Sequence, residues 1–270
     1  MKVGFVQFSP IFGKPQKNLE RIKSLLEGKR ADLIVLPELS DTGYLFSSRD
    51  EAFNLASTLP GPVSDELQEI AKEIGGCVVA GVCERAGKRV YNSACLVAPN
   101  GLVGVYRKSH LFGLEKKWFD PGNTGFNVYR INGVKVGLMI CFDWIFPEAA
   151  RVLALKGAQI ICQPANLILP FCQKAMLTRA LENRVFIITA NRIGKESRKG
   201  YNTLRFTGSS QIVSPDSTIL IKAPKARNCV GIIEINPDDA LNKTFYPPND
   251  LFSDRRPELY KKICERKLNP

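Results

Sequence analysis

Short apolar runs rich in β-branched residues recur along the whole chain, and stretches with helical periodicity lie between several of them. The runs typical of buried strands are residues 3–8, 33–36, 77–82, 91–98, 102–106, 134–140, 160–162, 185–190, 211–213, 218–221 and 230–235. Helical patterns cover residues 16–26, 63–74, 147–156 and 172–184. Helices and strands therefore alternate, and a Pro-Asn-Gly turn at residues 99–101 favours a hairpin. This order predicts an α/β chain with a mixed sheet.

The length of 270 residues allows one large domain or two small ones. No linker rich in Ser, Gly or Pro and no repeat of constant period divides the sequence. We therefore expect a single domain over residues 1–270. Residues from about 237 to 270 have weak periodicity and resemble an extended C-terminal arm. Such an arm packs either on a neighbouring subunit or on its own surface, and the sequence leaves both open.

Hydropathy, cysteine spacing and charge indicate which binding partners and which cellular compartment to expect. No apolar run approaches the ~20 residues that span a bilayer, and the first residues lack the regions of a signal peptide. We expect a cytoplasmic protein without a membrane partner. The eight cysteines are scattered without a CxxC pair, which argues against a zinc site or a disulfide framework. The net charge of +12 is spread along the chain without a nucleic-acid-binding motif, so we expect a solvated basic surface and no nucleic-acid partner.

Cys141 is the first candidate for a reactive group. It ends the apolar run 134–140 and directly precedes a helical stretch, which predicts a strand, a sharp turn and a helix. A cysteine at such an elbow has its sulfur exposed at the end of the strand. The sulfur also lies beside the positive end of the following helix, where a thiolate is favoured. The alternative is a small buried hydrophobic residue, which is common for free cysteines.

A catalytic cysteine needs a base, and His110 is the only histidine in the chain. A carboxylate whose pKa is raised by burial can serve instead. Glu38 closes the buried run 33–36, at the mouth of a strand where α/β folds place functional groups. Glu115 lies in a segment rich in aromatic residues. Taken alone, the two acids are also compatible with a surface loop and a salt bridge at the rim of a site.

Lys108 follows the strand expected at residues 102–106. A lysine in this position is either an exposed charge or a fixed cation that stabilises an oxyanion beside a thiolate. Glu38, Lys108 and Cys141 thus each follow an expected strand. Their shared placement at strand ends favours one common site.

The strings around these residues resemble those of the nitrilase, or carbon-nitrogen hydrolase, superfamily. In that superfamily a glutamate, a lysine and a cysteine occur in this order on strings similar to Leu36-Pro37-Glu38, Tyr106-Arg107-Lys108-Ser109-His110-Leu111 and Cys141-Phe142-Asp143-Trp144-Ile145-Phe146-Pro147-Glu148. Supporting similarities lie at residues 164–166, 179–184, 190–194, 206–212 and 254–260. The resemblance covers nearly the whole chain, in order.

The resemblance implies a role for each residue. Glu38 is expected to take the proton of the Cys141 thiol, which attacks the substrate and becomes a thioester. Lys108 and the backbone N–H of Phe142 are expected to stabilise the oxyanion. Glu115 is expected to position the substrate or the attacking water. The expected oxyanion and substrate-binding residues are completed by Asn166 and Tyr44. No metal and no organic cofactor is implied, and His110 is expected to be structural.

The same resemblance implies a four-layer α-β-β-α sandwich with mixed sheets. Its subunits are expected to pair helix face to helix face, as a homodimer or a larger homo-oligomer. The substrate is expected to be a small molecule. Phe142-Asp143 is closer to the Tyr-Asp of many amidases than to the Trp-Glu of nitrile-hydrolysing members. This favours hydrolysis of a small amide to a carboxylic acid and ammonia or an amine.

Three alternatives to an amidase remain open at this point. Trp144 and the following Phe-Pro-Glu string are similar to archaeal enzymes named nitrilases, which makes a nitrilase the leading alternative. Trp144 is also similar to hydrolases of N-carbamoyl amines, the third candidate. A binding protein that kept the fold and lost activity would be expected to lack Glu38, Lys108 or Cys141, and all three are present.

Overall fold

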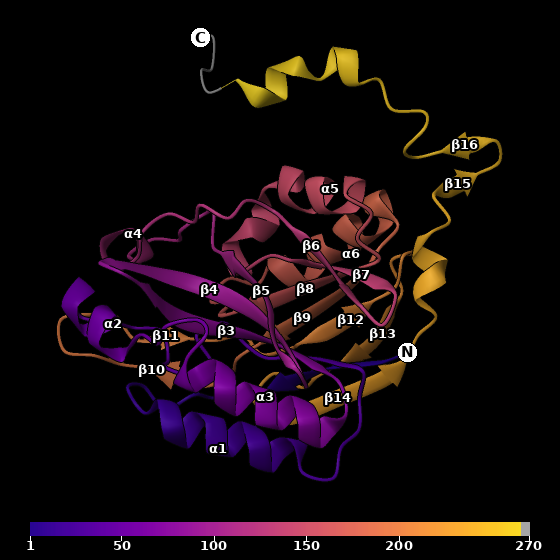
Figure 1. Ribbon diagram of the computed structural model, residues 1–270. Helices are drawn as coiled ribbons and strands as arrows, with labels where there is room; N and C mark the ends of the chain where they lie inside the picture. The colour runs from indigo at the N-terminus through magenta and orange to yellow at the C-terminus, as the bar shows by residue number, and fades with distance from the viewer. Residues whose placement is uncertain (266–270) are drawn as a thin grey trace.

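The computed structural model describes residues 1–265, which form two six-stranded sheets packed face to face (Figure 1). The first sheet has the order β14-β1-β2-β3-β4-β5 and the second the order β13-β12-β9-β8-β7-β6. The first contains β1 (Lys2–Gln7), β2 (Leu33–Val35), β3 (Cys77–Ala86), β4 (Arg89–Ala98), β5 (Gly101–Arg107) and β14 (Cys229–Glu234). The second contains β6 (Val128–Ile131), β7 (Val134–Leu138), β8 (Ile160–Ala165), β9 (Phe186–Asn191), β12 (Gln211–Val213) and β13 (Ile219–Lys222).

Helices cover the outer face of each sheet (Figure 1). The first sheet is covered by α1 (Pro15–Leu26) and α3 (Pro62–Ile74), and the second by α5 (Pro147–Leu155) and α6 (Cys172–Asn183). On α1 the buried residues include Leu19, Ile22 and Leu26, at the spacing that places them on one face of a helix. The expected α/β class and four-layer α-β-β-α sandwich are confirmed.

Both sheets are mixed, as expected. In the first, β1, β2 and β3 are parallel, whereas β14, β4 and β5 pair antiparallel with their neighbours. In the second, β7, β8 and β9 are parallel. The pairing of β1 with β14 aligns Val3 with Ile233. It therefore joins the first strand of the two large sheets to the last. Parallel pairing places the carboxyl ends of β7 and β8 at one sheet edge.

Every strand and helix expected from the sequence is present, with shifts of a few residues at the ends. The structure adds β6 and several short elements. These are α2 (Arg49–Leu55), α4 (Glu115–Trp118) and the two small hairpins β10 (Lys195–Glu196) with β11 (Leu204–Arg205) and β15 (Thr244–Tyr246) with β16 (Asn249–Asp250). Elements this short carry too few residues for a clear period, so the sequence pattern does not reveal them.

After β14 the chain leaves the two sheets and runs past α5 (Figure 1). This segment contains η2 (Pro237–Ala240), the β15–β16 hairpin, η3 (Pro257–Leu259) and η4 (Lys261–Cys264). Apolar side chains stay exposed along it, among them Phe245, Tyr246, Leu259 and Ile263. The last part of the expected arm, residues 266–270, lies outside the described residues. The single domain and the arm stay predictions.

Candidate active site

Glu38 follows β2 and is held against β3 by a close backbone contact. The N–H of Gly81 donates to the Pro37 carbonyl at 3.1 Å, and the N–H of Ser40 donates to the Gly81 carbonyl at 2.8 Å. A Cβ at position 81 would lie 2.3 Å from the Cα of Glu38. Only glycine allows the two backbones to come this close, so Gly81 sets the position of the carboxylate.

Lys108 lies between two carboxylates in the interior of the protein. Its Nζ is 2.6 Å from Glu38 Oε1 and 2.8 Å from the Glu115 carboxylate. All three side chains have no exposed surface. Lys108 directly follows β5, and Glu115 lies in the first turn of α4. Glu38 follows β2, far earlier in the sequence, and the fold brings it to the other two.

Burial alone would lower the pKa of Lys108, but the nearby carboxylates of Glu115 and Glu38 outweigh it and raise the pKa above its usual value. The pKa of Glu115 is also raised, because burial favours its neutral form more than the Lys108 charge favours the ionised form. Lys108 therefore carries a stable positive charge, whereas Glu115 is closer to taking up a proton than an exposed glutamate.

Asn92, on β4, is part of this cluster and was missed in the sequence. Its Nδ2 donates to Glu38 Oε1 at 2.7 Å, and its carbonyl accepts the N–H of Lys108 at 2.8 Å. One asparagine thus fixes both the acid and the lysine. The only signal in the sequence is a polar pair, Asn92 and Ser93, inside a largely apolar strand.

Cys141 is the first residue of the short 3₁₀ helix η1 (Cys141–Ile145), which follows β7, and α5 begins two residues after η1 ends. Its φ is +39°, in the left-handed region, and its side chain is 7% exposed. The expected elbow is present. The expected stabilisation of the thiolate is wrong: burial, followed by the Glu38 charge, raises the pKa of Cys141 well above its usual value. Lys108 and the backbone amide of Asn166 act in the opposite direction but do not reverse the shift.

The sequence-predicted residues converge on the thiol. The charges of Glu38, Lys108 and Glu115 all act on Cys141. Tyr44 lies beside them, because its hydroxyl donates to Glu115 Oε1 at 2.8 Å. The acids and the lysine follow elements of the first sheet, whereas Cys141 follows the second, so the site forms where the two sheets meet.

Several buried polar atoms at this site have no hydrogen-bond partner among residues 1–265. They are Glu38 Oε2, Asn92 Oδ1 and both amide atoms of Asn166. Asn166 directly follows β8 and is 3% exposed. Buried polar groups are nearly always paired in folded proteins. These atoms are therefore available to a substrate.

Two further networks hold the loops of the site. Glu196 accepts the backbone N–H of Leu45 at 2.7 Å and of Tyr44 at 3.1 Å, and pairs with the buried Arg192 at 2.6 Å. Nδ1 of His110, when it carries a proton, donates to Asp143 Oδ1 at 2.7 Å. The ring of His110 stacks on the ring of Phe146, with 3.7 Å between the centroids. This packing fits a structural role for His110.

A cavity of about 520 Å³ lies beside the cluster. Tyr44 and Trp118 line it together with Phe112, which packs edge-on against the ring of Phe142 at 5.0 Å. Tyr201, from the loop between β10 and β11, lines it as well. The lining is mainly aromatic and aliphatic, as in many small-molecule sites. Tyr44 joins this cavity to the cluster, because it lines the cavity and its hydroxyl contacts Glu115.

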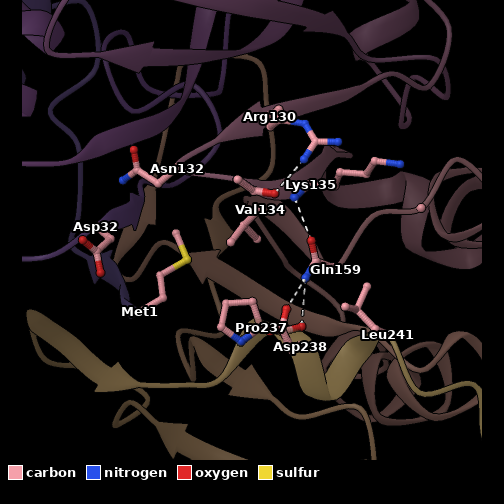
Figure 2. A pocket seen from close by; sticks show the side chains of 12 residues that line it. Met1, Asp32, Arg130, Asn132, Val134, Lys135, Gln159, Pro237, Asp238 and Leu241 are labelled. Carbon is pink, nitrogen blue, oxygen red and sulfur yellow. Dashed lines mark hydrogen bonds between the residues drawn. The ribbon is translucent and has the colours of Figure 1, made fainter.

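A second cavity, of about 660 Å³, opens where β7 and β8 begin, at the opposite ends of these strands from Cys141 and Asn166 (Figure 2). Gln159 crosses it, accepting the Lys135 N–H at 3.0 Å and donating to the Pro237 carbonyl at 3.2 Å. None of the sequence-predicted site residues lines this cavity, whereas Tyr44, which is hydrogen-bonded to Glu115, lines the first. The second cavity is therefore not the candidate site.

Within residues 1–265, no group of three or more His, Cys, Asp or Glu side chains is arranged to hold a metal ion. All eight cysteines are free thiols. In the same described part of the chain, no helix combines the length and the apolar character needed to cross a bilayer.

The profile of the carbon-nitrogen hydrolase family matches residues 2–241, so the chain belongs to this family and is a hydrolase of carbon–nitrogen bonds other than peptide bonds. A protein named nitrilase from Pyrococcus abyssi is 45% identical over 264 residues, which are 96% of this chain and 99% of that protein. The N-carbamoylputrescine amidase of Solanum lycopersicum is 32% identical and covers 90% of this chain and 87% of its own. The crystal structure of a carbon-nitrogen hydrolase from Helicobacter pylori G27 has a TM-score of 0.89 at 27% identity and covers 99% of both chains.

Proposed function

We propose that the protein hydrolyses a small amide through a thioester on Cys141. The observation that carries this proposal is the buried cluster of Glu38, Lys108 and Glu115, whose charges all act on the Cys141 thiol. Burying three ionisable groups is costly even when they are paired. The pKa values of Lys108 and Glu115 are raised, and groups with shifted pKa values beside a potential nucleophile are typical of catalytic sites.

In the first half of the reaction, Glu38 accepts the thiol proton and the thiolate attacks the amide carbon. The Lys108 ammonium and the N–H of Phe142 stabilise the oxyanion. Glu38 returns the proton to the amide nitrogen, the C–N bond breaks, and ammonia or an amine leaves. Water then gives a proton to Glu38 and attacks the thioester. The carboxylic acid leaves and the thiol regains the proton.

The raised pKa of Cys141 fits this order of events. The cysteine rests as a thiol, so a base must remove its proton when the substrate is bound. Glu38 Oε2 has no other partner among the described residues and is available for that proton. Glu115 is assigned to holding Lys108 and positioning the substrate or the water. Tyr44 and Asn166 are assigned to substrate contact. Every step uses only side chains, backbone and water.

The unpartnered atoms support an amide over a nitrile, because three of them are acceptors and one is a donor. The acceptors are Glu38 Oε2, Asn92 Oδ1 and Asn166 Oδ1, and the donor is Asn166 Nδ2. An amide brings both N–H donors and a carbonyl acceptor, whereas a nitrile brings only an acceptor nitrogen, which pairs with the donor alone. Leaving a buried acceptor unpaired costs about 1–3 kcal/mol. An N-carbamoyl group also brings N–H donors and fits the same acceptors.

The nitrilase alternative is kept because the Pyrococcus abyssi relative, at 45% identity, carries that name. The test is a panel in which each acyl group is offered as the amide and as the matching nitrile, with N-carbamoyl amines added. Carboxylate release and the mass of Cys141 are followed together. Faster turnover of amides, with an acyl mass on Cys141, supports the proposal. Faster carboxylate release from nitriles would make the protein a nitrilase, and a reaction that leaves Cys141→Ala as active as the parent would refute the mechanism.

We also propose that the protein is a homodimer or a larger homo-oligomer formed through α5 and α6. Val152 and Leu155 are exposed on α5, and Leu259 and Ile263 are exposed on the C-terminal segment. Paired subunits would cover these apolar side chains. Sedimentation of the purified chain tests the assembly, and a monomer at micromolar concentration would refute it. The cytoplasmic location and the lack of a nucleic-acid partner stay predictions.

A further inference from the structure

Gln163 is a fully buried polar residue in the middle of the apolar strand β8. Burying a carboxamide is costly unless its hydrogen bonds are made. Its Oε1 accepts the hydroxyl proton of Thr189 at 2.8 Å. Its Nε2 donates to the carbonyl of Cys141 at 3.1 Å and contacts the sulfur of Cys172 at 3.5 Å. The proposed reaction gives this side chain no role.

The residue that Gln163 contacts has a strained backbone. Cys141 has a φ of +39°, and a left-handed conformation costs a residue with a Cβ roughly 1–2 kcal/mol. Such a conformation persists only where the surroundings hold it. On the N-terminal side, the N–H of Ile140 donates to Asp143 Oδ2 at 2.8 Å. On the C-terminal side, Cys141 opens the turn η1, and the Gln163 amide donates to its carbonyl from outside that turn.

We propose that Gln163 is a positioning residue for the nucleophile, because its hydrogen bond holds the left-handed backbone of Cys141, which sets the direction of the Cα–Cβ bond and so the place of the sulfur. Relaxation of φ to a negative value would rotate the Cα–Cβ bond and move the sulfur. A displacement of about 1 Å at reacting atoms can cost about 100-fold in rate. The importance of this hydrogen bond for turnover rests on the proposed function. Its effect on the position of the Cys141 thiol does not depend on that function.

The test replaces Gln163 by methionine, which keeps the length of the side chain and removes both polar atoms. Gln159→Met is the matched control. Gln159 is also a buried glutamine of the β8 segment that bridges backbone groups, but it lies at the opposite end of the strand from Cys141. Both variants are expected to lose stability, so all rates are measured on the folded fraction at a temperature where each variant is native.

Two rates are compared. The first is alkylation of Cys141 by iodoacetamide without substrate, followed by mass spectrometry of the peptide. The second is kcat and KM for the best amide. We expect Gln163→Met to lower kcat about 100-fold with a much smaller change in KM, and to slow alkylation. Gln159→Met is expected to leave both rates at the parent value. A folded Gln163→Met with the parent alkylation rate and kcat would overturn the proposal, as would equal losses in the two variants.

Thr189→Val provides a second, milder variant if Gln163→Met does not fold. It removes the hydroxyl that anchors Gln163 Oε1, so the side chain can rotate and release the Cys141 carbonyl. Smaller losses in the same two rates are expected, and parent rates would overturn the proposal. The alkylation measurement also separates the two proposals. If no amide acylates the parent protein, the proposed function fails, while the alkylation rates still decide whether Gln163 positions the thiol.

Discussion

Replacing Lys108 by methionine should destabilise the protein strongly at neutral and basic pH. Lys108 is the cation between Glu38 and Glu115, at 2.6 Å and 2.8 Å, and none of the three side chains is exposed. Removing one partner of a buried ion pair costs about 3–5 kcal/mol, because the remaining charge stays buried without compensation. Two carboxylates lose their counter-charge here, so we expect a loss in the upper part of this range at pH 8.

The loss should shrink as the pH falls. The pKa of Glu115 is already raised by burial, and Lys108 is the group that limits this rise. An acid whose folded pKa lies above its unfolded pKa loses stability as the pH rises from the unfolded toward the folded value. Removing Lys108 extends that window upward. While one proton is bound, the slope is about 1.4 kcal/mol per pH unit, so most of the loss should be regained by about pH 5.

The titration of Lys108 itself adds no pH dependence to the free energy of unfolding between pH 5 and pH 8. Its pKa is raised, so its stabilising charge is present at all pH values below the unfolded value and is lost only under strongly basic conditions. The pH dependence of the difference in unfolding free energy therefore reports Glu115.

The assay is urea unfolding of the parent and Lys108→Met at pH 5, 6.5 and 8. Lys116→Met is the control, because Lys116 is an exposed residue eight positions later. The control should stay within about 0.5 kcal/mol of the parent. A loss below about 1 kcal/mol at pH 8, or a loss of equal size at all three pH values, would refute the idea that Lys108 compensates two buried charges.

Three further predictions follow from the site and the C-terminal segment. Cys141→Ala should keep the fold, checked by circular dichroism, and should show no acyl mass with any amide that modifies the parent. Tyr44→Phe removes a hydrogen bond that lowers the pKa of Glu115, so any limb of the profile of kcat/KM against pH that reports Glu115 should move to higher pH; an unchanged profile would exclude Glu115 from the reaction. Deleting residues 244–270 removes the exposed apolar side chains of the arm, and sedimentation should show a smaller assembly; unchanged size and stability would exclude an inter-subunit strap.

The layers of this fold could be predicted from sequence because the strands and helices carry long, regular patterns. Residues such as Leu19, Ile22 and Leu26 on α1 show the helical period directly. The candidate site could be located because Glu38, Lys108 and Cys141 each follow a strand, where side chains gather at a sheet edge. Their motifs also resemble a known family, which supplied their roles.

The residues that hold the site in place could not be predicted in the same way. Asn92 and Gln163 are polar residues within largely apolar strands, and their importance depends on what lies beside them in the folded chain. Gly81 matters because another backbone crosses it. The state of the Cys141 thiol was mispredicted for a related reason: the local turn suggested a stabilised thiolate, whereas burial beside Glu38, from the other sheet, dominates its pKa.

The pairing of β1 with β14 has a consequence for how the protein is made. Val3 aligns with Ile233, a residue that the ribosome adds much later. A nascent chain therefore contains all the proposed reactive residues long before its first sheet can be completed. Contacts between segments so distant in sequence form slowly, since a long loop must close first. Catalytic competence should therefore arise only after the last strand of the sandwich has been synthesised, and fragments ending before β14 should be inactive even though they contain Cys141.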